Sequence, residues 1–225
     1  MTPTLSRRLA LLIDHAVLAP LATMADMEEA CHKAKVAGLA SVCVKPWMVL
    51  GAATILKGSG VVASTVIGFP QGGMHPRIKL AESAQALADG ARELDMVANL
   101  GWVAGGEWTK VADEIHTIAE LSHRTGAKLK VILETCLLND EQKRKLCAVA
   151  ASSGADFVKT STGYATAGYT MDDLKLMRES VPDHVGVKAS GGVRNLAQAV
   201  ALLDAGINRI GTGSTWAILE EAAKG

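Results

Sequence analysis

The stretch "KLKVILETCLLNDEQKRKLCAVAASSGADFVKT", residues 128–160, decides the fold of this chain. The apolar runs at 128–135 and 156–160 are typical of buried strands, and the pattern at 140–153 is that of a helix opening on an aspartate. A strand, a helix and a second strand in this order predict a parallel βαβ unit. We therefore searched the rest of the chain for the same unit.

The alternation of strand and helix extends over the whole sequence. Strand-like runs occur at 12–14, 41–45, 61–67, 93–98, 128–135, 156–160, 185–189 and 209–211. Clear helical patterns lie between them at 26–37, 76–89, 108–125, 140–153, 171–180 and 195–204. No linker or block of charge divides the series. The sequence predicts an α/β fold, a single-domain (β/α)8 TIM barrel over residues 1–225, with a doubly wound sheet as the alternative.

The balance of charged residues indicates which kind of binding partner to expect. Lys and Arg number 23, and so do Asp and Glu, which gives a formal net charge of zero. A neutral chain offers no electrostatic reason to bind nucleic acid or an anionic membrane, so we expect a small-molecule ligand. No stretch reaches the roughly 20 apolar residues of a membrane span. The sequence leaves a homo-oligomer open.

Two features predict a reducing compartment. The apolar run after Arg7 and Arg8 is interrupted by Asp14 and His15, too early for a secretory signal. The four cysteines show no CxxC spacing and no nearby histidine pair, so we interpret them as reduced thiols with no zinc site. We expect a cytoplasmic protein.

Polar residues occur where barrel strands end. Alternation along the strands puts Lys130, Lys159 and Lys188 on the inward faces of three neighbouring strands, and Asp95 on the inward face of a fourth. Cys43 faces inward as well, and we expect it to pack rather than react because no histidine is placed to activate it. The alternation therefore predicts that three lysines and an aspartate meet inside the barrel.

Lys159, in "ADFVKTSTGY", has two interpretations. A single lysine at a strand end is often a surface residue that keeps its ammonium in water. Three interior ammonium groups, however, should depress one another's pKa and leave a fraction of neutral, nucleophilic amine. Asp95 would then be a structural counter-ion, a proton shuttle, or both.

Two glycine-rich loops follow the last two strands. "SGGVRN" and "GTGST" each precede a helix, where backbone N–H groups hold a phosphate in many barrels. Either loop alone is more simply a tight turn, but two adjacent ones beside an arginine favour a phosphate site. Its expected residues are Gly191, Gly192, Arg194, Gly211, Gly213 and Ser214. We expect His15 and His75 to be satisfied or loop histidines, and "GFPQGG" to be a loop.

Four motifs carry a resemblance to a known family. "VKTSTG", "LDMVANLG", "LKVILET" and "VKASGGVR" occur in the order found in deoxyribose-phosphate aldolase, and the match runs from "IDH" to "GTGST". The chain resembles this family of class I aldolases with a (β/α)8 fold. The resemblance implies reversible cleavage of 2-deoxyribose 5-phosphate to acetaldehyde and glyceraldehyde 3-phosphate, without a metal or organic cofactor.

The resemblance also implies residue roles. Lys159 would form the Schiff base, Lys188 would lower its pKa, Asp95 would relay protons and Lys130 would be a polar partner of the intermediate. Gly191, Gly192, Gly211 and Ser214 would cradle the phosphate, and the small residues of "TST" would leave room for substrate.

Three departures from the family pattern bear on substrate preference. Ala16 stands where threonine is usual, Gly213 where serine is common, and Tyr164 where some relatives have a lysine and others an aromatic residue. They leave the amine chemistry intact. The alternatives are another class I aldolase or a transaldolase-like enzyme with a different or unphosphorylated substrate, and a non-catalytic barrel that binds phosphorylated metabolites.

Overall fold

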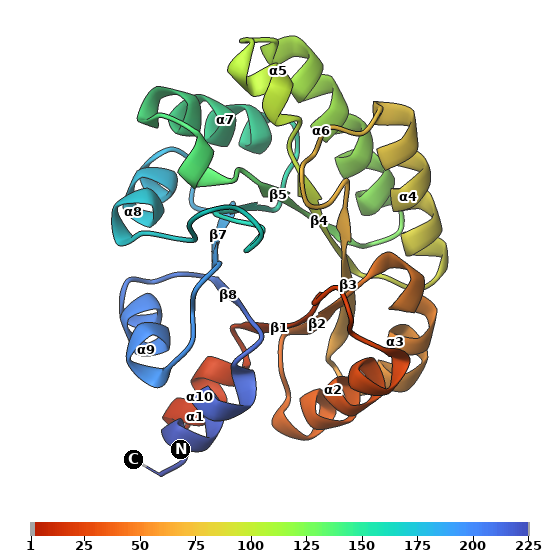
Figure 1. Cartoon of the computed structure of the whole chain (residues 1–225), viewed down its shortest axis with the longest axis vertical. Helices are drawn as coiled ribbons and strands as arrows, with labels where there is room; N and C mark the ends of the chain where they lie inside the picture. The colour runs from red at the N-terminus through yellow and green to blue at the C-terminus, as the bar shows by residue number, and fades with distance from the viewer. Residues whose placement is uncertain (1–2, 225) are drawn as a thin grey trace.

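A computed structural model describes residues 3–224, so the ends of the expected domain, residues 1–2 and 225, lie outside the described part. Within it, eight parallel strands close into a barrel in the order β1 to β8, and β8 pairs with β1. Figure 1 shows the helices as an outer ring around the strands. The predicted (β/α)8 fold is confirmed, and the doubly wound alternative is wrong because the sheet has no open edge.

The strands have the bounds β1 (Ile13–Val17), β2 (Ser41–Val44), β3 (Val62–Ile67), β4 (Glu93–Val97), β5 (Lys128–Ile132), β6 (Phe157–Lys159), β7 (Gly186–Ser190) and β8 (Arg209–Thr212). Each of the eight expected strands is present, with shifts of a few residues at the ends. Valine, isoleucine and leucine dominate the sides that face the helices, and these side chains form one continuous buried core.

The helices are α1 (Leu5–Ala10), α2 (Met24–Ala37), α3 (Val49–Leu56), α4 (Pro76–Ala88), α5 (Leu100–Ala104), α6 (Trp108–Arg124), α7 (Asp140–Ser152), α8 (Met171–Glu179), α9 (Leu196–Asp204) and α10 (Thr215–Ala222), with short 3-10 turns at Pro46–Met48 and Thr135–Leu137. The helix α1 packs against α10 and α9, which brings the two ends of the described chain together (Figure 1). The loops that follow the strands form one rim, where the active sites of such barrels lie.

None of the helices in the described residues is long and apolar enough to cross a membrane. "GFPQGG" forms a loop after β3, as expected. His75 caps α4 and accepts a hydrogen bond from the Arg77 backbone N–H, and buried His15 is hydrogen-bonded through Nδ1 to Thr215 Oγ1 at 2.8 Å. Both histidines are satisfied, as the sequence predicts.

Candidate active site

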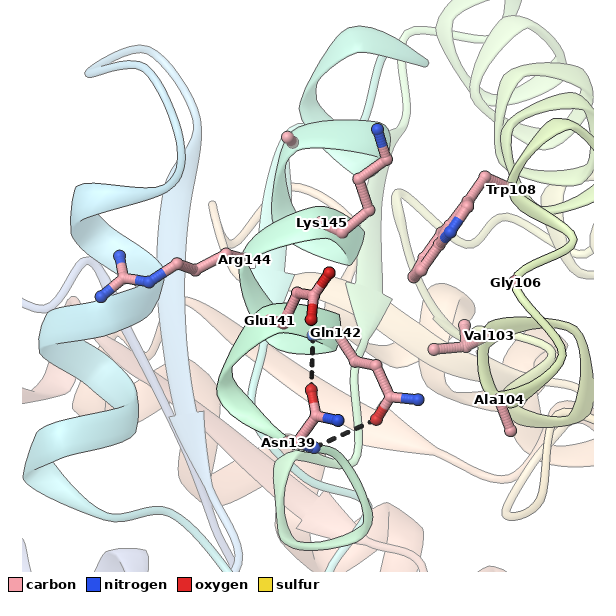
Figure 2. A pocket seen from close by; sticks show the side chains of 10 residues that line it. Val103, Ala104, Gly106, Trp108, Asn139, Glu141, Gln142, Arg144 and Lys145 are labelled. Carbon is pink, nitrogen blue, oxygen red and sulfur yellow. Dashed lines mark hydrogen bonds between the residues drawn. The ribbon is translucent and has the colours of Figure 1, made fainter.

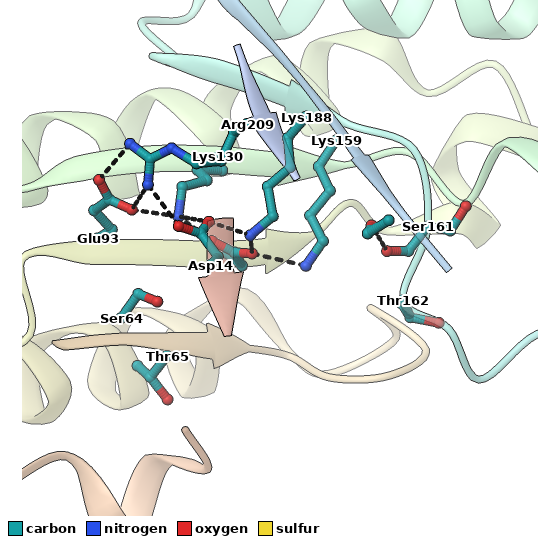
Figure 3. Close-up of polar contacts among 12 residues, drawn as sticks. Asp14, Ser64, Thr65, Glu93, Lys130, Lys159, Ser161, Thr162, Lys188 and Arg209 are labelled. Atoms are coloured by element: carbon teal, nitrogen blue, oxygen red, sulfur yellow. Dashed lines mark hydrogen bonds and ion pairs between the residues drawn. The ribbon is translucent and has the colours of Figure 1, made fainter. Parts of the chain in front are cut away.

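The barrel register places the three inward lysines next to one another. Lys159 is the last residue of β6, and it pairs with Lys188 on β7 and with Ile132 on β5. Lys130 lies two residues before Ile132. All three side chains are buried, and Figure 3 shows those of Lys159 and Lys188 side by side. The predicted convergence inside the barrel is confirmed.

Asp95 on β4 is the common partner of the three lysines. Its Oδ1 accepts a hydrogen bond from Lys130 Nζ at 2.8 Å. Its Oδ2 accepts from both Lys159 Nζ and Lys188 Nζ, each at 2.7 Å. One carboxylate oxygen therefore bridges the two lysines that reach the end of the barrel.

Three further charged residues complete the cluster, and the sequence analysis did not assign them to the site. Asp14 Oδ2 lies 2.5 Å from Lys188 Nζ and 3.2 Å from Lys130 Nζ, and Glu93 lies 2.6 Å from the latter. Arg209 contacts both Asp14 and Glu93 (Figure 3). One signal for Glu93 was present, because strand alternation puts it on the same face as Asp95.

Opposite charge controls the pKa values of two lysines. Burial disfavours the ammonium of Lys130, but Asp14, Asp95 and Glu93 outweigh it and raise the pKa of Lys130 well above its ordinary value. Burial also opposes the charge on Lys188, yet Asp14 and Asp95 raise the pKa of Lys188. Lys130 does lower the pKa of Lys188, as the sequence predicts, but the carboxylates outweigh this effect, so the expected net lowering is wrong for these two lysines.

Lys159 behaves differently. Burial lowers its pKa, Asp95 opposes that effect, and the nearby charge of Lys188 lowers the pKa further. The net pKa of Lys159 falls below its usual value, mainly through loss of water and only in second place through a neighbouring ammonium. Asp95 stays ionised, because Lys130, Lys159 and Lys188 overcome the effect of burial and hold its pKa well below the ordinary one.

A cavity of about 340 Å³ opens above this cluster at the rim of the barrel. Lys159, Lys188 and Cys43 contribute to its floor, whereas Asp95 and Lys130 are fully buried and do not line it. The expected phosphate-binding residues all line this cavity: Gly191, Gly192, Arg194, Gly211, Gly213 and Ser214. The structure thus joins the amine and the two glycine-rich loops in one space.

Backbone conformation favours glycine at two positions of the two loops, packing favours it at a third, and neither requires it at the fourth. Gly191 and Gly192 have φ of +80° and +103°, which favour glycine. A Cβ on Gly211 would lie 3.0 Å from Ser190 Cβ and 3.1 Å from Lys188 Cε, so this glycine makes room for both side chains. Gly213 has no left-handed backbone, and a Cβ there would meet only the Ala16 carbonyl oxygen at 3.7 Å. Neither backbone nor packing requires glycine at position 213.

Two loop features at the rim were not predicted. Tyr164 lines the cavity, donates its hydroxyl to the Leu18 carbonyl at 2.7 Å and packs edge-to-face on Phe69 of the "GFPQGG" loop. Glu134, buried and with a φ of +54°, accepts hydrogen bonds from the backbone N–H and hydroxyl of Thr162. A left-handed backbone at a non-glycine residue indicates strain that the surrounding structure maintains.

A larger cavity, about 690 Å³, lies outside the barrel between α7 and the segment around Trp108 (Figure 2). Asn139 and Gln142 in its lining are already used, since they form the capping box of α7. The residues that line it include none of the predicted site residues. Its size alone gives it no chemistry comparable to that of the lysine cluster.

Comparisons with known proteins agree with this geometry. The family model described as DeoC/LacD family aldolase matches residues 8–212. Deoxyribose-phosphate aldolase of Aciduliprofundum boonei is 45% identical over 96% of this chain and 97% of its own, and that of Thermococcus gammatolerans is 46% identical over 93% and 94%.

Solved structures of aldolases are also similar to this chain. The aldolase QR15 superposes with a TM-score of 0.91 at 38% identity, over 96% of each chain. The deoxyribose-phosphate aldolase from Aeropyrum pernix, described as a unique tetramer, superposes with a TM-score of 0.88 at 34% identity, over 96% of this chain and 91% of its own. From its sequence and its structure alike, this chain belongs to the DeoC/LacD family of aldolases.

Proposed function

We propose that this aldolase reversibly cleaves 2-deoxy-D-ribose 5-phosphate to acetaldehyde and D-glyceraldehyde 3-phosphate through a Schiff base on Lys159. The observation that carries the proposal is the lowered pKa of Lys159 in a cavity that also contains both glycine-rich loops. A neutral amine can attack a carbonyl carbon, whereas an ammonium cannot.

In the first step, the nitrogen of Lys159 attacks the C1 aldehyde of the open-chain sugar. The carbinolamine that forms loses its hydroxyl group as water and becomes an iminium ion. The positively charged nitrogen of the iminium can then accept an electron pair, so the proposed mechanism requires no metal or organic cofactor.

In the second step, the C2–C3 bond breaks. Its electrons move toward the iminium and form an enamine, while the C3 hydroxyl gives up its proton and C3 becomes the aldehyde carbon of glyceraldehyde 3-phosphate. Protonation of the enamine carbon and hydrolysis of the resulting iminium release acetaldehyde and restore Lys159. The reverse sequence forms the same bond.

Asp95 and Lys188 would support the proton transfers. Asp95 does not line the cavity, so it would act through the two lysines that do: its Oδ2 accepts a hydrogen bond from each and can relay a proton between them, being protonated only in transit. The raised pKa of Lys188 keeps that side chain charged beside Lys159. Lys130 does not line the cavity, so we propose that it acts by holding Asp95 in place rather than as a direct partner of the intermediate.

The phosphate would occupy the far end of the cavity. Backbone N–H groups in the two loops, the Ser214 hydroxyl and the Arg194 guanidinium supply donors there, and α10 begins directly after Ser214. Gly213 has no hydroxyl to add. This favours a site that also accepts unphosphorylated substrates, which is the second candidate function.

The proposal also covers the domain organisation, the cellular compartment and the oligomeric state of the enzyme. We propose one catalytic domain over the whole chain, acting in the cytoplasm, because the cysteines of the described chain are free thiols. The Aeropyrum pernix relative is described as a tetramer, so we propose a homo-oligomer for this chain, which sedimentation would measure.

Borohydride reduction in the presence of acetaldehyde tests the mechanism. The proposal expects an ethyl group on Lys159, located by peptide mass mapping, and loss of the adduct in Lys159→Arg, because a guanidinium stays protonated. Lys128→Arg, at an exposed lysine of β5, is the matched control and should keep the adduct. Labelling confined to surface lysines would overturn the proposal.

A further inference from the structure

The active-site cavity has a neighbour on the same rim. A second cavity, of about 440 Å³, lies between β1 with its following loop, α2 and the start of α10. Ala16, Ala19 and Gly213 line both cavities. The boundary between the two spaces is therefore made of the smallest side chains that proteins have.

The two cavities are poorly separated because Gly213 has no side chain. Its backbone is compatible with any residue, and a Cβ would meet nothing nearer than the Ala16 carbonyl oxygen at 3.7 Å. Ala16 is only half-buried, and Ala19 is exposed. No side chain from these three positions closes the phosphate end of the active-site cavity toward its neighbour.

The second cavity suits an uncharged group. Trp216 packs on the His15 ring at 4.8 Å between centroids, and Val17 and Leu21 add apolar surface. Burial, followed by the charge of Lys33, lowers the pKa of His15 to about 4, so this ring is neutral at physiological pH.

The charged residues that line the second cavity are already engaged, two in an ion pair and the third in hydrogen bonds. Lys33 Nζ lies 2.6 Å from a Glu29 carboxylate oxygen and 5.6 Å from the centre of the Trp216 ring. Asp26 accepts hydrogen bonds from the Thr23 backbone and hydroxyl. The lining therefore offers a distal phosphate no free cation, but it offers an aromatic face and methyl groups to an apolar one.

We propose that the second cavity, lined by Ala19, Leu21 and Trp216, is an extension of the acceptor site, where it holds the distal group of aldehydes with a neutral, apolar or aromatic end. The proposal rests on the proposed function, because the acceptor is the aldehyde that the Lys159 enamine attacks. The enamine carbon bonds to the acceptor carbonyl carbon, the carbonyl oxygen takes a proton, and water releases the product from Lys159. The distal group is held but does not react.

The test compares two acceptors with acetaldehyde as donor. Propanal has no distal group, whereas 3-phenylpropanal carries a ring that the proposal places in the second cavity. We expect wild type to have the higher kcat/KM for 3-phenylpropanal. In Ala19→Leu, a side chain enters the passage, and the ratio of the two kcat/KM values should fall about tenfold through lost burial of the ring.

Ala25→Leu is the matched control, because Ala25 is exposed on α2 and lines neither cavity. It should leave the ratio at the wild-type value. An equal ratio in Ala19→Leu and Ala25→Leu, or a wild-type preference for propanal, overturns the extended site. Borohydride trapping at Lys159 and cleavage of deoxyribose 5-phosphate are measured in the same preparations. Failure of trapping overturns the proposed function and the extension with it, whereas trapping without the expected ratio overturns only the extension.

Discussion

Lys159 differs from the two lysines beside it in the number of carboxylates that it contacts. Within the described chain, Lys130 contacts three carboxylates, Lys188 two and Lys159 one. That single partner, Asp95, shares the contacting oxygen with Lys188. Since all three lysines are buried, the one with the least compensating charge loses its proton most easily. The same barrel interior thus holds two lysines with raised pKa values and one lysine with a lowered pKa.

Replacing Lys188 tests this distribution of charge. In Lys188→Leu, a positive charge next to Lys159 is lost, and Asp95 Oδ2 is left to Lys159 alone, so both changes raise the pKa of Lys159. Because the neutral amine reacts, the rising limb of the pH–rate profile should move to higher pH, and activity at pH 7 should fall at least tenfold. The profile is measured for imine trapping and for turnover.

Lys175→Leu, at an exposed lysine of α8, is the control for that experiment and should keep the wild-type profile. A Lys188→Leu enzyme whose limb stays in place, with only a lower maximum, would mean that Lys188 acts on the substrate and not on the pKa of Lys159.

Gly213→Ser tests the phosphate end of the cavity. The backbone there is not left-handed and an added Cβ would meet nothing nearer than the Ala16 carbonyl oxygen at 3.7 Å, so serine should be accepted without strain. A hydrogen bond to a charged group is worth about 1.5–3 kcal/mol, roughly tenfold or more in specificity. We therefore expect kcat/KM for deoxyribose 5-phosphate to rise relative to that for deoxyribose. Equal changes for both sugars would show that position 213 makes no phosphate contact.

Residue-level sequence analysis found part of the charged cluster. The period of two along a strand is local, so it places Lys130, Lys159, Lys188 and Asp95 inside without knowledge of neighbours. The contacts of Asp14 and Arg209 join the first and last strands, 195 residues apart. No local pattern encodes that pairing. Because the sequence did not place the carboxylate of Asp14 beside Lys188, it predicted a lowered pKa for Lys188, whereas that pKa is raised.

At the scale of elements, α4 and α6 are joined by a fully buried ion pair. Lys79 Nζ lies 2.9 Å from Glu114 Oε2 and donates to the Val97 carbonyl at the end of β4. Burial lowers the pKa of Lys79 and raises that of Glu114, so both charges are costly and each depends on the other.

Glu114→Leu should therefore lower the free energy of unfolding by about 3 kcal/mol, because it leaves an uncompensated ammonium between two helices. Adding Lys79→Met should restore most of the loss. Urea unfolding of wild type, both single variants and the double variant measures the coupling. Additive losses in the double variant would mean that the helices are held by packing and not by this pair.

The predicted ends of helices and strands were wrong where hydrogen bonds of polar side chains, rather than the apolar pattern, determine where an element begins or ends. The helix expected at 26–37 begins at Met24, because Thr23 and Asp26 form a capping box. The strand expected at 12–14 continues to Val17, since the polar Asp14 and His15 are buried and satisfied there. The helix α3, Val49–Leu56, gave no clear pattern because nearly all its residues are apolar.

For the whole molecule, the charged cluster takes the place of apolar side chains at the centre of the barrel. Such a centre is stable only while every ion keeps its partners, because removing one leaves the others buried and unpaired. The closed barrel keeps water away from Asp14 and Asp95, both fully buried. Global stability should consequently depend on pH through these two carboxylates.

The sign of that dependence follows from their pKa values. Lys130, Lys188 and Arg209 outweigh burial and hold the pKa of Asp14 far below that of an unfolded chain, and the pKa of Asp95 is lowered in the same way. A carboxylate with a depressed folded-state pKa stabilises the fold at pH above its unfolded value of about 3.9, and that contribution is lost as pH falls. Below that pH, two such groups should reduce the free energy of unfolding by about 2.7 kcal/mol per pH unit.

Denaturant unfolding between pH 7 and about pH 2, followed by circular dichroism, measures this slope below the unfolded-state pKa. Asp14→Asn should be less stable at pH 7 by about 3–5 kcal/mol, because it leaves buried cations without a partner. Its stability should also fall less steeply in acid, by about 1.4 kcal/mol per pH unit, since one titrating group is gone. Asp113→Asn, at an exposed aspartate of α6, is the control and should keep the wild-type slope. An Asp14→Asn protein that loses stability in acid as steeply as wild type would place the acid sensitivity outside the barrel, in the surface charges.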